Sequence, residues 1–227
     1  MLPVHEFHRL QEQRMKIVLI SIIHSFKYGN TGIDYIANYL RRDNRDIIET
    51  RYFHRNECTD DIMAGLPIEC DLYGFSIFET NYIQSREIAT KIKKKNKDAI
   101  IVFGGKFVSM NYASLIDKCN DVDYFIVGDG EAPLKRIIEH HKNRIDLLRN
   151  DPNIALNNDI ENKIENREQD INRSSDLDYF INDTEENNSQ KTHCIMTKSN
   201  ICTGNCSFCC STKGKAIYKN TERIVSE

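Results

Sequence analysis

The chain has 227 residues, 40% of them hydrophobic, which suffices for one domain of ordinary size or for one domain and a fragment of another. Its net charge of −3 gives no overall attraction to nucleic acid or to a membrane surface. No run of the sequence approaches the roughly 18 consecutive apolar residues of a membrane span, and the first residues lack the pattern of a secretory signal. We therefore expect no nucleic-acid partner, no membrane and a cytoplasmic location, with the 8 cysteines reduced or bound to metal.

The first 150 residues alternate between apolar runs typical of buried strands and segments with helical spacing. Five strands are expected, at 16–22, 46–52, 71–77, 99–104 and 122–127. Helices are expected at 33–42, 81–95 and 114–119, and from 132 to about 148. The alternation indicates an α/β fold with a doubly wound, parallel, five-stranded sheet that helices cover on both faces.

Small and polar residues stand at the ends of the third, fourth and fifth predicted strands or just after them, at the edge where open parallel sheets bind ligands. They are Ser76, Thr80, Gly104, Gly105, Gly128, Gly130 and Glu131. Glycines there let a ligand approach the backbone closely, although tight turns alone also use them. Neither G-x-G-x-x-G after the first strand nor a phosphate-loop motif occurs, which disfavours dinucleotide and nucleoside triphosphate ligands.

A cluster of cysteines near the end of the sequence has the spacing C-x3-C-x2-C, formed by Cys202, Cys206 and Cys209. Three thiolates on one short loop can hold three corners of an iron–sulfur cube and leave the fourth iron open to a substrate or cofactor. Ferredoxin-type clusters instead use four cysteines at other spacings. The alternatives are a set of metal-free thiols and a structural zinc site whose fourth ligand is Cys210, Cys194 or His193.

The segment 197–211 around these cysteines resembles the cluster loop of the radical SAM enzymes, with Phe208 matching the aromatic residue of that pattern. The resemblance implies a [4Fe–4S] cluster held by the three cysteines, with S-adenosylmethionine chelating the open iron. Reductive cleavage then gives a 5′-deoxyadenosyl radical, so a reductant such as flavodoxin or ferredoxin is implied as a partner. Residues 219–227 are similar to the start of the first barrel helix of the family.

The segments 100–105 and 124–133 resemble the last two strand ends of the cobalamin-binding domain that precedes many radical SAM barrels, a flavodoxin-like, Rossmann-like fold. In that domain one strand ends in Gly-Gly and the next in Gly-x-Gly-Glu. The resemblance implies a corrin on the carboxyl edge of the sheet, facing the cluster. Its cofactor contacts are then Ser76, Thr80, Gly104, Gly105, Gly128, Gly130 and Glu131.

The first strand is not followed by the D-x-H-x-x-G motif that supplies an axial histidine in other cobalamin domains. His24 lies in the corresponding loop, but without the aspartate and the glycine spacing. We therefore do not expect His24 to be an axial ligand of cobalt. The radical SAM relatives generally lack this histidine too.

Composition divides the chain into residues 1–150, a cobalamin-binding-like domain, an acidic linker at 151–191, and the first βα unit of a barrel at 192–227. The linker is rich in Asp, Glu and Asn and has no clear periodicity, which favours an extended or loosely ordered connector. Only one βα unit of roughly 30 residues fits after it. We therefore expect a truncated product, a fragment, or half of a split enzyme that a second chain completes, with the last residues poorly ordered on their own.

The leading functional hypothesis is the N-terminal part of a cobalamin-dependent radical SAM enzyme that transfers a methyl group to an unactivated carbon of a small-molecule or peptide substrate. One S-adenosylmethionine would give the radical, and another would methylate the cobalamin. Two alternatives remain, a non-catalytic cobalamin-binding module and a zinc-stabilised doubly wound interaction domain. The sequence offers no catalytic residue, because most of the barrel is not in it.

Overall fold

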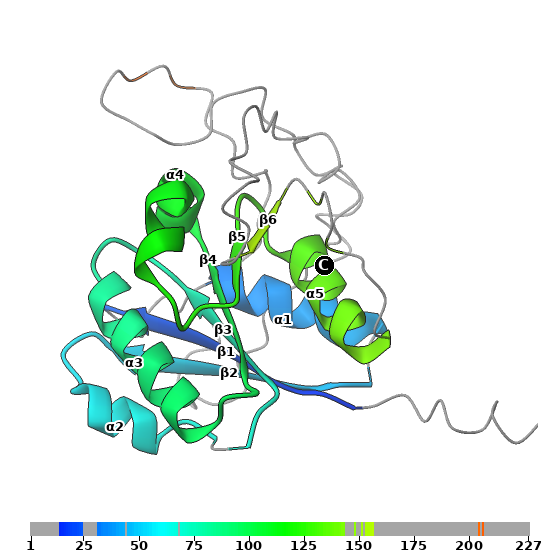
Figure 1. Cartoon of the computed structure of the whole chain (residues 1–227), viewed down its shortest axis with the longest axis horizontal. Helices are drawn as coiled ribbons and strands as arrows, with labels where there is room; N and C mark the ends of the chain where they lie inside the picture. The colour runs from blue at the N-terminus through cyan, green and yellow to red at the C-terminus, as the bar shows by residue number, and fades with distance from the viewer. Residues whose placement is uncertain are drawn as a thin grey trace, which may run out of the picture.

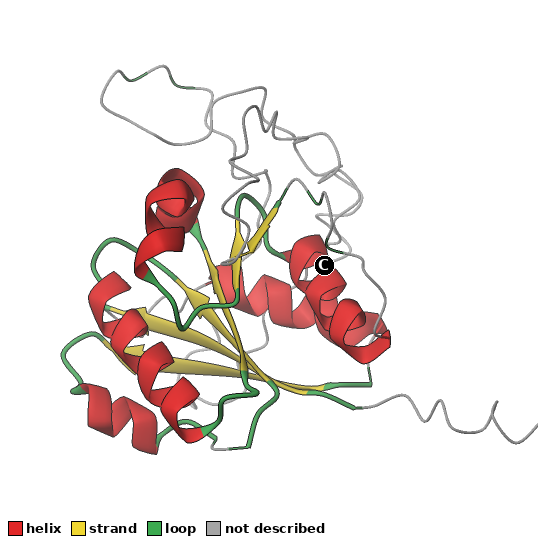
Figure 2. Cartoon of the chain, viewed as in Figure 1, coloured by secondary structure: helices red, strands yellow, loops and turns green. Residues whose placement is uncertain are grey.

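The computed structural model describes residues 14–24, 31–43, 45–67, 69–143, 148, 151, 153–156, 204 and 206. Within these ranges the chain forms a sheet with helices on both of its faces (Figures 1 and 2). Of the predicted barrel unit, the described residues include only Gly204 and Cys206. The predicted linker beyond residue 156 lies outside them.

The sheet formed by the described residues has six strands in the order β2-β1-β3-β4-β5-β6. Their bounds are β1 Lys16–Ile23, β2 Ile47–His54, β3 Leu72–Ser76, β4 Ile100–Gly104, β5 Tyr124–Ile126 and β6 Ile154–Leu156. Strands β1 to β5 are parallel, whereas β6 pairs antiparallel with β5. The predicted doubly wound parallel sheet is confirmed, and β6 adds a strand at the start of the range assigned to the linker.

The described helices are divided between the two faces of the sheet. Their bounds are α1 Thr31–Asp43, α2 Thr59–Ala64, α3 Tyr82–Lys95, α4 Lys106–Leu115, followed by the 3₁₀ turn η2 Ile116–Lys118, and α5 Glu131–Asn143. Helices α2, α3 and α4 bury Ile62, Ile88 and Val108 against one face, and α1 and α5 bury Leu40 and Ile137 against the other (Figure 1). None of the described helices is long and apolar enough to cross a lipid bilayer.

Strand β1 is buried on both faces, as its uninterrupted apolar sequence predicts. Val18 and Ile20 pack on the side of α3, while Ile17 and Leu19 pack on the side of α1. Successive side chains of a strand point to opposite faces, so an apolar run satisfies both cores at once. Each fully buried side chain of this kind contributes roughly 1.5–3 kcal/mol to the hydrophobic stabilisation of the fold.

Two helices differ from the sequence prediction. Helix α4 begins at Lys106, not at residue 114, because Gly105 adopts a φ of +99° and turns the chain directly from β4 into the helix. Helix α2 was not predicted, since its 6 residues bury only Ile62 and show no helical periodicity. The described part of α5 ends at Asn143.

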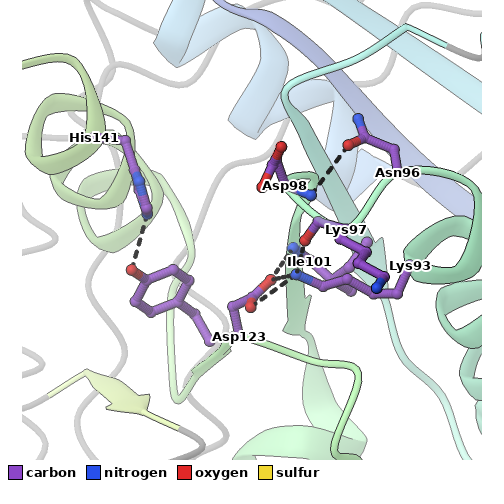
Figure 3. A network of polar contacts seen from close by, with 8 residues as sticks. Lys93, Asn96, Lys97, Asp98, Ile101, Asp123 and His141 are labelled. Carbon is purple, nitrogen blue, oxygen red and sulfur yellow. Dashed lines mark hydrogen bonds and ion pairs between the residues drawn. The ribbon is translucent and has the colours of Figure 1, made fainter.

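Aspartates link neighbouring strands at the amino edge of the sheet. Three of them stand just before a strand, and each accepts the backbone N–H at the start of the adjacent strand. The pairs are Asp46 with Met15 at 2.9 Å, Asp71 with Lys16 at 2.7 Å, and Asp123 with Ile101 at 2.7 Å. Lysines of the helices add ion pairs. Lys142 Nζ lies 3.1 Å from Asp46 Oδ1. Lys93 Nζ lies 2.8 Å from Asp123 Oδ2 (Figure 3).

Candidate functional site

The structure brings the predicted cofactor-binding residues to the carboxyl edge of the parallel strands. Ser76 and Gly104 end β3 and β4 and are partners in the strand register. The other predicted residues lie in the turns that follow, namely Thr80 before α3, Gly105 before α4, and Gly128, Gly130 and Glu131 after β5. Strand order reverses between β1 and β3, and ligands of open α/β sheets bind at such a reversal.

Gly104 and Gly105 are adjacent, but the fold requires a glycine only at the second position. A Cβ on Gly105 would lie 2.9 Å from the carbonyl oxygen of Ile77, and its φ of +99° disfavours other residues. Among the residues that the structure describes, a Cβ on Gly104 would meet only Ile126 Cβ, at an ordinary 3.7 Å. Packing among these residues therefore does not explain the missing side chain of Gly104, and they leave room for a ligand at this edge.

Ser109, which no sequence pattern predicts, joins the loops that follow β4 and β5. Its Oγ donates to the carbonyl oxygen of Gly105 at 3.0 Å and accepts the N–H of Gly128, also at 3.0 Å. Gly128 has a φ of +89°, and a Cβ on Gly130 would lie 2.8 Å from Ile36 Cδ1 on α1. These glycine loops are thus shaped by contacts with α1 and α4.

Asn81 occupies the reversal of strand order and is fully buried. Its Nδ2 donates to the carbonyl oxygens of Ile22 in β1, at 3.0 Å, and Ser76 in β3, at 3.1 Å. Its Oδ1 accepts the N–H of Phe78 at 2.8 Å. Asn81 begins the predicted helix 81–95 and directly precedes α3, a position where asparagine often caps the helix through its side chain. Here the side chain instead joins two strands and shapes the turn that carries Thr80.

Glu131 is the first residue of α5 and follows the last glycine loop. Burial, and to a lesser extent the nearby carboxylate of Asp129, raise the pKa of Glu131 to about 7, while backbone N–H donors oppose this shift. The side chain therefore titrates near neutral pH, so a ligand at this edge would meet a carboxyl group that can be neutral or charged.

His24, at the end of β1, is exposed and packs beside β2. Its Nε2 lies 3.4 Å from Arg55 Nη1, and its carbonyl oxygen lies 2.8 Å from His54 Nε2. One ring nitrogen of His24 is thus already next to a guanidinium group. The expectation that His24 is not an axial ligand stays a prediction.

The predicted cluster cysteines are not brought together within the described residues. Cys206 is exposed, as is Gly204 beside it, whereas Cys202 and Cys209 lie outside the described residues. A cavity of about 630 Å³ lies at the other edge of the sheet, next to Lys16, Ile47 and Cys70. It is at the opposite end of the strands from the glycine loops, so it is not the predicted site.

Comparison with known proteins identifies the family to which this domain belongs. The B12 binding domain model matches residues 10–138, more than half of the chain. The chain therefore belongs to the B12 binding domain family, and the predicted resemblance to the cobalamin-binding domains of radical SAM enzymes is confirmed. No protein with a curated description matches the sequence.

Solved structures of a radical S-adenosylmethionine methyltransferase, TsrM from Kitasatospora setae, have a similar fold. The form with tryptophan substrate and a SAM analogue matches with a TM-score of 0.58 and 15% identity over 93% of this chain. The form with cobalamin and a [4Fe–4S] cluster matches with a TM-score of 0.50 and 18% identity over 65% of it. The chain spans 44% and 28% of the length of these two structures. Its α/β part is thus a cobalamin-binding domain similar in fold to that of a radical SAM methyltransferase.

Proposed function

We propose that this chain supplies the cobalamin-binding domain and the cluster loop of a cobalamin-dependent radical SAM methyltransferase. Gly104 carries the proposal for the cofactor edge, because the described part of the fold leaves the space beside it open in a chain of the B12 binding domain family. When bound, cobalamin would supply a cobalt centre able to carry a methyl group. The methyl acceptor would be an unactivated carbon of a small-molecule or peptide substrate.

The carboxyl edge would hold the cofactor through backbone and small polar side chains. Ser76 and Thr80 offer hydroxyl groups beside the reversal of strand order, and Gly104 allows close approach. The positive φ angles of Gly105 and Gly128 shape the loops on either side, and Gly130 leads to Glu131 at the start of α5. A large planar ring fits such an open edge better than an enclosed cavity.

The second part of the proposal concerns the cysteine loop. Cys202, Cys206 and Cys209 would hold a [4Fe–4S] cluster with one open iron, where S-adenosylmethionine would bind. A reductant such as flavodoxin or ferredoxin would supply the electron in the cytoplasm. The exposure of Cys206 supports this role, since a metal or cluster must reach the thiolate.

The test is an anaerobic titration of the whole chain with hydroxocobalamin, read by visible absorbance after unbound ligand is removed. We expect near-stoichiometric retention with a base-off spectrum. Gly104→Ala adds a methyl group that the fold accommodates, so it should weaken retention about tenfold while the urea midpoint is unchanged. Ser114→Ala, on the exposed surface of α4, is the control.

Each part of the proposal has its own contradicting result. A folded chain that retains no cobalamin would contradict the role of the carboxyl edge. Iron and sulfide should bind after anaerobic reconstitution and be lost in Cys206→Ala. A colourless protein with stoichiometric zinc would instead support the zinc-stabilised interaction domain, and cobalamin retention without a cluster would support a non-catalytic binding module.

A further inference from the structure

The segment after α5 returns to the sheet and becomes part of its core. In β6, Ile154 and Ala155 pair with Ile126 and Phe125 of β5 (Figure 1). These two residues of β6 are buried, with Ile154 in the core beside α1 and α5, and Ala155 in the core on the opposite face. The family match ends at residue 138, so this segment lies beyond it.

Asn153, just before β6, binds both backbone polar groups of one residue, Val127, at the start of the loop that contains Gly128, Gly130 and Glu131 (the cofactor loop). The N–H of Val127 donates to the carbonyl oxygen of Asn153 at 2.8 Å. In return, Asn153 Nδ2 donates to the carbonyl oxygen of Val127 at 2.9 Å. Val127 immediately precedes Gly128, and a Cβ on Gly128 would lie 3.4 Å from the same Nδ2. The amide side chain thus lies directly against the first glycine of the loop.

Asn153 is itself held by α5 through a buried aspartate. Asp151 Oδ1 accepts the N–H of Asn153 at 2.9 Å, and Asp151 Oδ2 accepts the Nε–H of Arg136 on α5. Asp151 also accepts the N–H of Ile154 through its carbonyl oxygen, at 3.3 Å. A continuous set of bonds therefore runs from Arg136 to Val127 and fixes the place of Asn153.

We propose that Asn153 is a positioning residue for the loop that contains Gly128, Gly130 and Glu131, and that the cofactor domain extends through Leu156. This inference rests on the proposed binding of cobalamin at that loop. Glycine at positive φ has many accessible conformations, so ordering the loop costs conformational entropy. A loop held in place before the ligand arrives avoids that cost on binding and gives a tighter complex.

A purely structural role for this segment makes a different prediction. Backbone pairing alone allows β6 to cover the edge of β5, which protects the sheet from pairing with another chain. The side-chain amide of Asn153 is not needed for that pairing. Its bond to Val127 is the side-chain contact that connects Asn153 to the cofactor loop, beside the backbone bond between the same two residues, so the test must change the amide and keep the backbone.

The test compares Asn153→Asp and Asn153→Ala in the full chain with Asn96→Asp. The first replaces the Nδ2 donor by an oxygen facing the carbonyl of Val127, and the second removes the side chain. Asn96 is the matched control, since its Oδ1 accepts the N–H of Asp98 at 3.1 Å at the amino edge, and a carboxylate can do the same (Figure 3). The readouts are hydroxocobalamin affinity and amide hydrogen exchange of the ligand-free proteins.

We expect Asn153→Asp to weaken cobalamin binding about tenfold and Asn153→Ala about threefold, with Asn96→Asp unchanged. In the two Asn153 variants, amide hydrogen exchange should accelerate at Val127 and Gly128 and stay slow in β1 and β3. Wild-type affinity in Asn153→Asp would overturn this inference alone. Loss of protection in β1 and β3 as well would also overturn it, because the residue would then be structural. Failure of the wild type to bind would overturn the proposed function and this role with it.

Discussion

The amino edge and the carboxyl edge of the sheet are cross-linked by different kinds of group, although the same parallel strands form both. At the amino edge, Asp46, Asp71 and Asp123 join neighbouring strands, and two of them also pair with lysines. At the carboxyl edge, the cross-links that reach the loops of the predicted site residues are the neutral amides of Asn81 and Asn153 and the hydroxyl of Ser109.

This difference between the two edges assigns fold stability mainly to the amino edge and ligand binding mainly to the carboxyl edge. Charged pairs at the amino edge connect strands and helices strongly, but they would hinder a large cofactor with an apolar ring. Glycine loops at the carboxyl edge allow close approach at a cost in conformational entropy. Small neutral side chains order those loops without occupying the space beside Gly104. Changes at the amino edge should therefore reduce stability alone, whereas changes at the carboxyl edge should reduce cobalamin affinity.

The largest effect is expected at the amino edge, from Asp46→Ala. The side chain of Asp46 is fully buried, and its removal leaves Lys142 and the N–H of Met15 without this partner. Breaking a buried ion pair costs roughly 3–5 kcal/mol, so the free energy of unfolding in urea should fall by about that amount. Asp46→Asn, which keeps the acceptor for Met15, should lose less. A loss below about 1 kcal/mol, or weakened cobalamin binding by the folded variant, would contradict the comparison.

An intermediate effect is expected from pH, through Glu131 at the carboxyl edge. Its pKa is about 7 in the folded protein and 4.5 as its ordinary value, so the folded protein binds the proton more tightly. Tighter proton binding by Glu131 in the folded state stabilises the fold. This stabilisation is complete below about pH 4.5 and is lost as the pH rises through about 7. At about 1.36 kcal/mol per pH unit, the loss is at most about 3 kcal/mol.

Glu131→Gln should remove this part of the pH dependence. The measurement is the free energy of unfolding of both proteins between about pH 4.5 and pH 8, and the difference between them isolates Glu131. Parallel profiles would contradict the raised pKa and with it the desolvation of the carboxyl group.

The smallest effect on stability is expected from Thr80→Val at the carboxyl edge. Thr80 is exposed, so the free energy of unfolding should change by less than about 0.5 kcal/mol. Loss of one hydroxyl contact should weaken cobalamin binding about two- to tenfold. Thr90→Val is the control, because Thr90 Oγ1 donates to Asp121 Oδ2 at 2.6 Å near the amino edge. It should reduce stability and leave cobalamin affinity unchanged, and the reverse result would break the comparison.

The positions of the predicted site residues at one sheet edge could be inferred from sequence, because they follow strands with clear apolar runs. Gly105 and Gly128 also have the positive φ angles that make glycine informative. Their roles in binding remain predictions. Ser109 and Asn153 could not be found in this way, since a serine within a helix and an asparagine in an acidic segment give no distinctive pattern. Strand β6, with 3 residues, is too short for periodicity to reveal.

By itself, the sequence determined the alternation of strands and helices, the parallel sheet and the glycine-bearing edge, because burial periodicity is a local property of the chain. Only the tertiary structure decided which side chains join the loops at that edge. The bonded residues are separated by 59 positions for Asn81 and Ile22, by 19 for Ser109 and Gly128, and by 26 for Asn153 and Val127. Hydrogen bonds of this kind depend on distances and angles between distant segments, which exist only once the strands have paired.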